Sequence, residues 1–211
     1  MTTASAASYS DLVLPTWRCI TELHDLVEIF EPGIQICSWQ RSVDRDIDEY
    51  LAALPASPSV QGMEILSPGN DPQLSHLPGI NECKSLIEDL ANLREILQEL
   101  LGCDEVGMRF ARVNDAMCPG WHFDRVGIRL ICTYQGPGTQ WLDDQSTERE
   151  TLYLQNIEHG SLVQADRGDV VLLKGSLWQG NKGFGAIHRS PELEPGAPPR
   201  TVVTLDPLWN D

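Results

Sequence analysis

Hydrophobic side chains recur at helical spacing in the first half of the chain. The most regular stripe lies between residues 82 and 101, where its members are separated alternately by four and three positions: Leu86, Leu90, Leu93, Leu97 and Leu100. This period predicts an α-helix with one apolar face. Asn81 is a candidate N-cap, and Gly102 directly follows the predicted end. We expect the face to pack on a sheet, although the same spacing could serve as the seam of a homodimer through the 82–101 helix.

A second stripe predicts a shorter helix that begins after Ser42 and ends before Pro55. Its apolar positions are Val43, Ile47, Leu51 and Leu54, with acidic residues in the first turns, where the helix dipole favours them. The following residues, 55–80, are rich in Pro, Ser and Gly and are typical of a long loop. The sequence therefore predicts that the first 104 residues form a helical or irregular supporting segment.

After Gly102 the pattern changes to the two-residue alternation of β-strands. It is clearest from Val126 to Tyr134, where every second residue is apolar or aromatic. Other short segments with strand character are 108–110, 151–157, 170–173, 185–190 and 201–205. The sequence therefore predicts an α+β fold in which residues 105–211 form a double-stranded β-helix, or jelly roll. The N-terminal helices of residues 1–104 would support it within one compact unit.

The charge of the chain narrows the classes of partner. Its 211 residues carry 31 acidic and 15 basic side chains, a formal net charge of −16. Such a field disfavours attraction to phosphate backbones, so we expect a small-molecule substrate and no nucleic acid. The first seventeen residues lack the features of a signal peptide, and no apolar run approaches the length of a membrane span. The expected protein is cytoplasmic, without a membrane partner.

Two histidines and an aspartate carry the candidate chemistry. His122 and Asp124 are two residues apart, so on a strand they would project to the same face, and His188 follows 66 residues after His122. Two imidazoles and one carboxylate on one side of a divalent ion are the ligands of non-haem Fe(II) oxygenases, and they leave positions open for substrate and oxygen. Zn or Mn is the alternative metal. Cys118 could contribute a thiolate to a zinc site, but a core or loop role is the simpler interpretation.

A cationic anchor for an organic acid is expected on the last strand. Arg200 alternates there with Val202 and Thr204, so Arg200 and Thr204 can point to the metal side together. An arginine offers two parallel hydrogen bonds to a carboxylate such as that of 2-oxoglutarate. Tyr134 is a candidate for an additional hydroxyl donor to the same carboxylate. Arg129 is either an inward partner of an anion or an outer, solvated residue.

Several motifs together resemble a known family. They are Cys118-Pro119-x-x-His122-x-Asp124, Gly136-Pro137-Gly138-Thr139-x-Trp141-Leu142, Leu172-Leu173-Lys174-Gly175 and His188-Arg189-Ser190-Pro191. They resemble a bacterial family that carries a domain of unknown function. The order of elements over residues 105–207 is similar to that of 2-oxoglutarate/Fe(II)-dependent oxygenases, particularly the prolyl-hydroxylase-like branch. The resemblance implies His122, Asp124 and His188 as metal ligands and Arg200 as the cosubstrate anchor.

These observations favour an Fe(II)/2-oxoglutarate-dependent dioxygenase that acts on a small-molecule or amino-acid-like substrate. One alternative is a cupin-like metal-binding protein without 2-oxoglutarate chemistry, in zinc or metal handling. Another is a non-catalytic dimerisation module built on the 82–101 helix. The Gly-rich connection 175–185 departs from the oxygenase pattern, and it would act either as a lid or as an obstacle to the usual cosubstrate pose.

Overall fold

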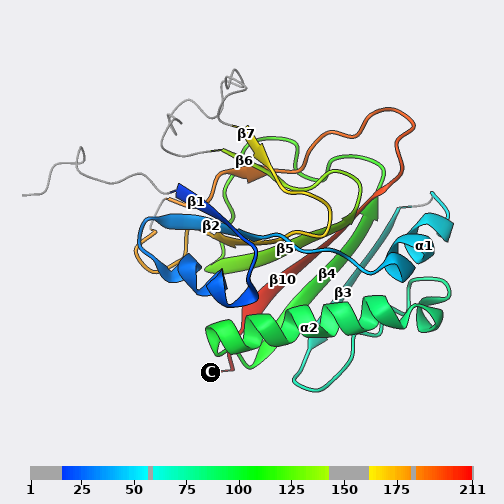
Figure 1. Ribbon diagram of the computed structural model, residues 1–211, viewed down its shortest axis with the longest axis horizontal. Coiled ribbons are helices and arrows are strands. Elements are labelled where there is room, and N and C mark those ends of the chain that lie inside the picture. The colour runs from blue at the N-terminus through cyan, green and yellow to red at the C-terminus, as the bar shows by residue number, and fades with distance from the viewer. Residues whose placement is uncertain (1–15, 57–58, 143–161, 182–183, 211) are drawn as a thin grey trace, which may run out of the picture.

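A computed structural model describes residues 16–56, 59–142, 162–181 and 184–210. Its main element is a seven-stranded sheet with the order β1-β2-β8-β5-β10-β4-β3 (Figure 1). These strands are β1 (Thr16–Ile20), β2 (Ile34–Trp39), β3 (Val60–Leu66), β4 (Glu105–Val113), β5 (Ile128–Gln135), β8 (Val170–Lys174) and β10 (Arg200–Leu208). All neighbours are antiparallel except the pair β1 and β2. A second sheet has three strands in the order β7-β6-β9, formed by Leu162–Gln164, Gln140–Leu142 and His188–Arg189.

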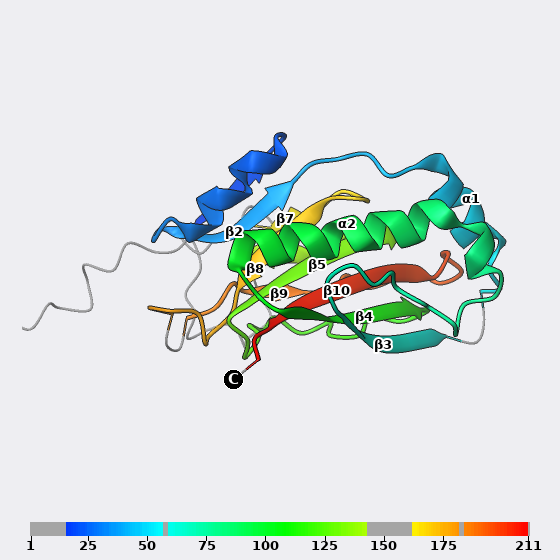
Figure 2. The same cartoon turned by 90° about the horizontal axis from the view of Figure 1, so that it is seen from below.

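Helices cover one face of the large sheet. Figure 2 shows α2 (Lys84–Leu101) running along this face, and α1 (Arg45–Ala53) lies beside it. The leucines of the predicted stripe at positions 86, 90, 93 and 97 are fully buried, in one cluster with Leu130, Leu172 and Leu205 of the sheet. The stripe therefore packs on the sheet of its own chain, as expected.

The opposite face of the large sheet packs against the small sheet. A second apolar cluster joins Ile131, Val171 and Val202 of the large sheet to Trp141 of β6. The molecule is thus a mixed α+β structure of three layers: helices, a large antiparallel-rich sheet and a small sheet. Among the described residues, seven strands form the large sheet and three form the small sheet. A cavity in this structure is lined by residues of β4, β5 and β10 from the large sheet and of β9 from the small sheet.

The helix predictions are confirmed with small shifts at the N-termini. Helix α1 begins two residues later than expected, because the side chain of Asp44 caps it by accepting a hydrogen bond from the Asp46 amide at 2.8 Å. Helix α2 begins at Lys84 rather than directly after Asn81, since a turn of 3-10 helix, Ile80–Glu82, precedes it. Gly102 ends α2 in the left-handed conformation, as its position predicted.

The description of the N-terminal half as helical or irregular was incomplete. It contains three strands of the large sheet, β1, β2 and β3, as well as a 3-10 helix, Leu23–Phe30. Strand β2 is buried on both faces, so its sequence has no polar alternation that could mark it. Strand β3 lies inside the predicted loop 55–80 and is an edge strand that exposes Met63 and Ile65. The strand predicted at 151–157 lies outside the described residues.

None of the helices in the described part of the chain has the length and the apolar character that a membrane span requires.

Candidate metal centre

His122 and His188 are brought together by a single β-bridge rather than by two long strands. The amide of His122 donates to the carbonyl of His188 at 3.1 Å, and the reverse bond measures 2.9 Å. Residues directly opposite one another in an antiparallel bridge project their side chains to the same side. The imidazole centroids are accordingly 4.4 Å apart. The expected convergence of the two histidines is therefore present, although His122 belongs to the connection between β4 and β5.

Asp124 completes a group of three donor residues. Its Oδ1 lies 3.7 Å from Nε2 of His122, and its Oδ2 lies 3.6 Å from Nε2 of His188. All three ligand atoms fall within 4.8 Å of one another. Donors that share one ion at about 2.1 Å lie roughly 3.0–3.4 Å apart, so the three side chains would have to move closer together to hold a metal. Cys118 lines the same cavity but is not part of this donor group.

The proton positions on the two imidazoles also suit a metal. Nδ1 of His122 lies 2.9 Å from the carbonyl of Gly120, and Nδ1 of His188 lies 2.9 Å from the carbonyl of Ala186. A carbonyl can only accept, so each Nδ1 carries a proton, and Nε2 is the ring atom that remains for a metal. Burial, opposed by the negative charge of Asp124, holds the pKa of His188 well below its ordinary value. The neutral imidazole that metal ligation requires is therefore the stable form.

The start of the Gly-rich connection 175–185 supports the backbone of Asp124. Amides of Gly175, Ser176 and Leu177 donate to carbonyls of the segment 124–127 at 2.8–3.0 Å. A Cβ at Gly175 would clash with the carbonyl oxygen of Val126, and one at Gly185 would stand 2.9 Å from Cβ of Phe123. Only glycine permits this approach of the two segments. These contacts make the described part of the connection a support for the candidate metal ligands.

Arg129 and Asp206 form an ion-pair chain with the carboxylate of Asp124. The Arg129 Nη1 donates to Asp124 Oδ2 at 2.7 Å, while Nε and Nη2 donate to the two oxygens of Asp206, each at 2.7 Å. Burial alone would lower the pKa of Arg129, but the two carboxylates raise it. Of the two expectations for Arg129, an inward partner of an anion or an outer solvated residue, the first is therefore correct. The side chain orients Asp124, a candidate ligand.

The role of Arg129 can be tested without changing the charge of the site. Arg129→Lys keeps the cation but removes the planar fork that joins Asp124 to Asp206. We expect the affinity for Fe(II) to fall about tenfold, within the range typical of residues that orient metal ligands. Anaerobic calorimetry measures this change. Arg109→Lys is the matched control, because Arg109 lines the same cavity without touching a ligand. Equal affinities in all three proteins would contradict the positioning role.

Arg200 lines the same cavity, of about 100 Å³, as the two histidines and Asp124. Its side chain is almost completely buried, at 2% exposure. The guanidinium donates to the carbonyl of Pro137 at 2.9 Å and to the hydroxyls of Thr133 and Thr139 at 3.1 and 3.2 Å. Nη1 makes one long contact, of 3.5 Å, to Ser190 Oγ. Burial lowers the pKa of Arg200 to about 10, so it remains a cation at neutral pH.

Thr204 and Tyr134, the other two candidate residues for the cosubstrate, lie on opposite faces of the sheet. Thr204 lines the cavity with Arg200, as the alternation along the last strand predicted. Tyr134 is fully buried on the helix side, where its hydroxyl donates to Asp89 Oδ2 at 2.5 Å. The suggestion that Tyr134 adds a hydroxyl to the cosubstrate site is therefore wrong. Tyr134 shares the face of Leu130 and Cys132, which the two-residue period assigns to the core.

Sequence reasoning missed three residues: Arg109 and Arg189, which line the cavity, and Asp206, which pairs with Arg129. Asp206 follows Thr204 by two positions, so the same alternation could have placed it on the cavity face. Arg109 is paired in register with Thr204, and Arg189 follows His188 directly. The register between β4 and β10 has no local signal in the sequence, so Arg109 could not have been found.

Comparisons with known proteins identify the family of the chain and solved structures that share its fold. The chain belongs to the family described as "Protein of unknown function (DUF1826)", whose model matches residues 21–206. The resemblance to a family with a domain of unknown function is thereby confirmed. A comparison with curated proteins gave no match.

Two solved structures illustrate the shared fold. A full-length Neurospora crassa protein, crystallised in complex with alpha-KG and 5-formyluracil, is 13% identical with a TM-score of 0.50, and the alignment covers 99% of this chain and 88% of that one. A bsmA homolog from Methylobium petroleophilum is 12% identical with a TM-score of 0.51, over 90% and 94% of the two chains. At these identities the similarity establishes the fold alone.

Proposed function

We propose that the protein is an Fe(II)- and 2-oxoglutarate-dependent oxygenase that acts on a small-molecule or amino-acid-like substrate. The observation that carries the proposal is the buried guanidinium of Arg200 in the same cavity as His122, Asp124 and His188. A buried cation is costly unless an anion accompanies it. No carboxylate of the described residues pairs with Arg200, so the anion would come from a ligand.

The anion that best suits this cavity is 2-oxoglutarate. One end of the molecule can chelate a metal, and its distant carboxylate needs a cation some way from the metal. Arg200 supplies that cation, and the hydroxyls of Thr133 and Thr139 hold its guanidinium in place. The fold is one in which a solved structure, that of the Neurospora crassa protein, contains alpha-KG. Zn or Mn could occupy the same donors, but zinc has no redox chemistry, whereas iron would supply oxidative chemistry when bound.

The chain's own residues would perform three tasks in such a reaction. The neutral imidazoles and Asp124 would hold the iron, Arg129 would orient Asp124, and Arg200 would bind the cosubstrate carboxylate. His188 and Arg200 are both nearly buried, so this side of the cavity is shielded from water. Low water content strengthens each charge interaction inside the cavity.

An anaerobic titration tests the proposal directly. We expect the protein to bind one equivalent of Fe(II), and the addition of 2-oxoglutarate should then produce a metal-to-ligand charge-transfer band in the visible spectrum. The band reports chelation of the iron by the cosubstrate, which metal binding alone does not produce. Succinate release in air with candidate substrates would follow. If Fe(II) binds tightly but neither the band nor succinate appears, a role in metal handling should replace the proposed function.

A further inference from the structure

The cavity at the metal centre contains more positive charge than the proposed metal and cosubstrate chemistry uses. Four arginines line it, Arg109, Arg129, Arg189 and Arg200, together with one acidic residue, Asp124. The chain as a whole has the opposite balance, with 31 acidic and 15 basic residues. A concentration of arginine in one cavity of an acidic protein needs a local explanation.

Two of the four arginines are already accounted for. Arg129 is neutralised by Asp124 and Asp206, to which it donates three hydrogen bonds of 2.7 Å. Arg200 is assigned to the carboxylate of the cosubstrate, and this assignment rests on the proposed function. Arg109 and Arg189 remain, and they come from different walls of the cavity. Arg109 belongs to β4 of the large sheet, and Arg189 belongs to β9 of the small sheet.

Arg109 and Arg189 are held in the same way, by a glutamine from the neighbouring strand. Nη2 of Arg109 donates to Oε1 of Gln61 at 2.8 Å, and Nε of Arg189 donates to Oε1 of Gln140 at 2.8 Å. Neither guanidinium has a carboxylate partner within the described ranges. A neutral amide oxygen orients the planar group while leaving its charge and its remaining N–H donors available.

The position of Arg189 is further restricted by an aromatic ring. Its guanidinium carbon lies 4.3 Å from the ring centroid of Trp121, a cation–π contact. The contact uses the face of the guanidinium and leaves its edge free for hydrogen bonds. A side chain held in this way loses little conformational entropy when it binds an anion. A freely rotating surface arginine would lose more conformational entropy on binding the same anion.

We propose that Arg109 and Arg189 bind an anionic group of the substrate, so that the substrate is a small molecule bearing a carboxylate or a phosphate. This anion is additional to the cosubstrate at Arg200. The acidic surface of the protein repels anions at long range, so local arginines are needed to retain such a substrate.

Inorganic phosphate and acetate serve as probes for the two anion chemistries. The protein is loaded anaerobically with Fe(II), saturated with 2-oxoglutarate and titrated with each probe by calorimetry at constant ionic strength. We expect Arg109→Gln and Arg189→Gln each to weaken binding of the preferred probe about tenfold, because a charge-assisted hydrogen bond is lost. Stronger binding of phosphate or of acetate identifies which anion the site suits.

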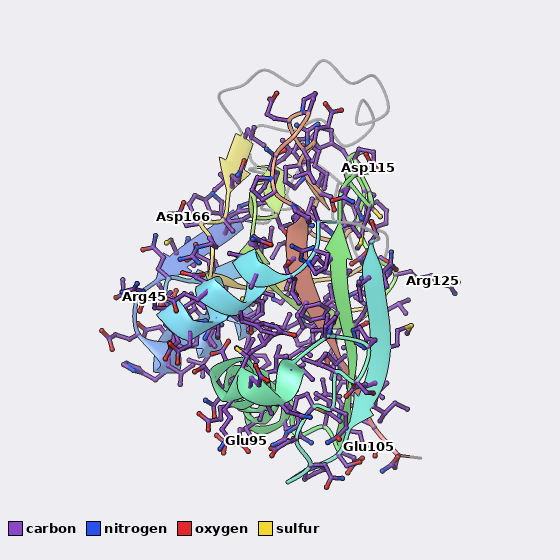
Figure 3. The ribbon with its side chains drawn as sticks, turned by 90° about the vertical axis from the view of Figure 1, so that its right-hand side faces the viewer. Arg45, Glu95, Glu105, Asp115, Arg125 and Asp166 are labelled. Atoms are coloured by element: carbon purple, nitrogen blue, oxygen red, sulfur yellow. The ribbon has the colours of Figure 1, made fainter. Side chains whose placement is uncertain are left out.

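Arg45→Gln is the matched control for the loss of one positive charge. Arg45 lies on α1 at the periphery of the molecule, and its exposed ion pair with Glu49 adds little stability (Figure 3). We expect this variant to bind the probe within about twofold of the wild-type affinity. Thermal unfolding of all variants verifies that they are folded. Equal weakening in Arg45→Gln, unchanged binding in the cavity variants, or no probe binding to the wild-type protein would each overturn the proposal.

A second titration separates this inference from the proposed function. Arg200→Gln is loaded with metal and titrated with the same probe in the absence of 2-oxoglutarate, so that Arg200 cannot bind the anion. If wild type fails to bind 2-oxoglutarate while probe binding still depends on Arg109 and Arg189, the anion site stands and the oxygenase proposal fails. If probe binding disappears only with Arg200, the assignment of Arg109 and Arg189 is wrong.

Discussion

His188→Ala is expected to lower the affinity for Fe(II) by about 100-fold or more while the protein stays folded. The substitution removes one of three donor groups, and a 100-fold loss corresponds to about 2.7 kcal/mol of binding free energy. His188 is 5% exposed, and its backbone bonds to His122 do not depend on the side chain. Anaerobic calorimetry gives the affinity, and the His122→Ala variant should behave similarly.

Thermal unfolding gives an independent measure of the same loss. A metal that binds only the folded state stabilises it, by about 2.7 kcal/mol at a concentration 100 times Kd. The midpoint of wild type should therefore rise with Fe(II), and that of His188→Ala should not. His24→Ala is the control, since His24 is an exposed histidine outside the donor group. Undiminished Fe(II) affinity in both the His122 and His188 variants would show that the ligands are different residues.

The candidate metal ligands could be predicted because their signal is local and chemical. His122 and Asp124 stand two positions apart, and few roles other than metal binding require an imidazole, a carboxylate and a distant second imidazole. The prediction did not need a full strand at His122, since one bridge to His188 is sufficient to direct both side chains to the same side. Local chemistry therefore predicted the site better than it predicted the secondary structure around it.

The strands of the N-terminal half could not be recognised from their sequences. Strand β2 is buried on both faces, and its six residues, with polar side chains at Gln35 and Ser38, do not keep the two-residue alternation of a half-buried strand. Strand β3 exposes the apolar side chains of Met63 and Ile65, so its sequence pattern would assign the solvent-facing side of the strand to the core. Their membership of the large sheet depends on pairing with β8 and β4, which lie far away in the chain.

The error at Tyr134 has a different origin. The alternation from Ile128 to Tyr134 already assigned Tyr134 to the apolar face, and its hydroxyl suggested chemistry that the face does not allow. In the core it forms a network with Asp89 and Arg41, in which Arg41 Nη2 donates to Asp89 Oδ2 at 2.8 Å. A buried hydroxyl needs a partner, and an acidic residue of α2 provides it here. At Tyr134 the two-residue period therefore determines the position of the side chain, and the hydroxyl group does not.

Arg200→Lys is expected to weaken 2-oxoglutarate binding by about 10- to 100-fold while Fe(II) affinity changes less than about twofold. Lysine keeps the positive charge but cannot reproduce the bonds of the guanidinium to Pro137, Thr133 and Thr139 that hold it in place. It also replaces a planar fork by a single ammonium group, so only one strong hydrogen bond to the carboxylate remains. Titration of the charge-transfer band with 2-oxoglutarate, after saturation with Fe(II), measures the cosubstrate affinity separately from the metal affinity.

Tyr134→Phe is the matched control for Arg200→Lys, because it removes a buried hydrogen bond from the opposite face of the same sheet. Loss of the bond to Asp89 should lower the free energy of unfolding by about 1–3 kcal/mol, since the carboxylate keeps only its bonds to Arg41. Binding of 2-oxoglutarate should be unchanged, because the hydroxyl does not reach the cavity. A loss of cosubstrate affinity in Tyr134→Phe equal to that in Arg200→Lys would mean that stability, rather than the fork of Arg200, determines binding. Full 2-oxoglutarate affinity in Arg200→Lys would remove Arg200 from the cosubstrate site.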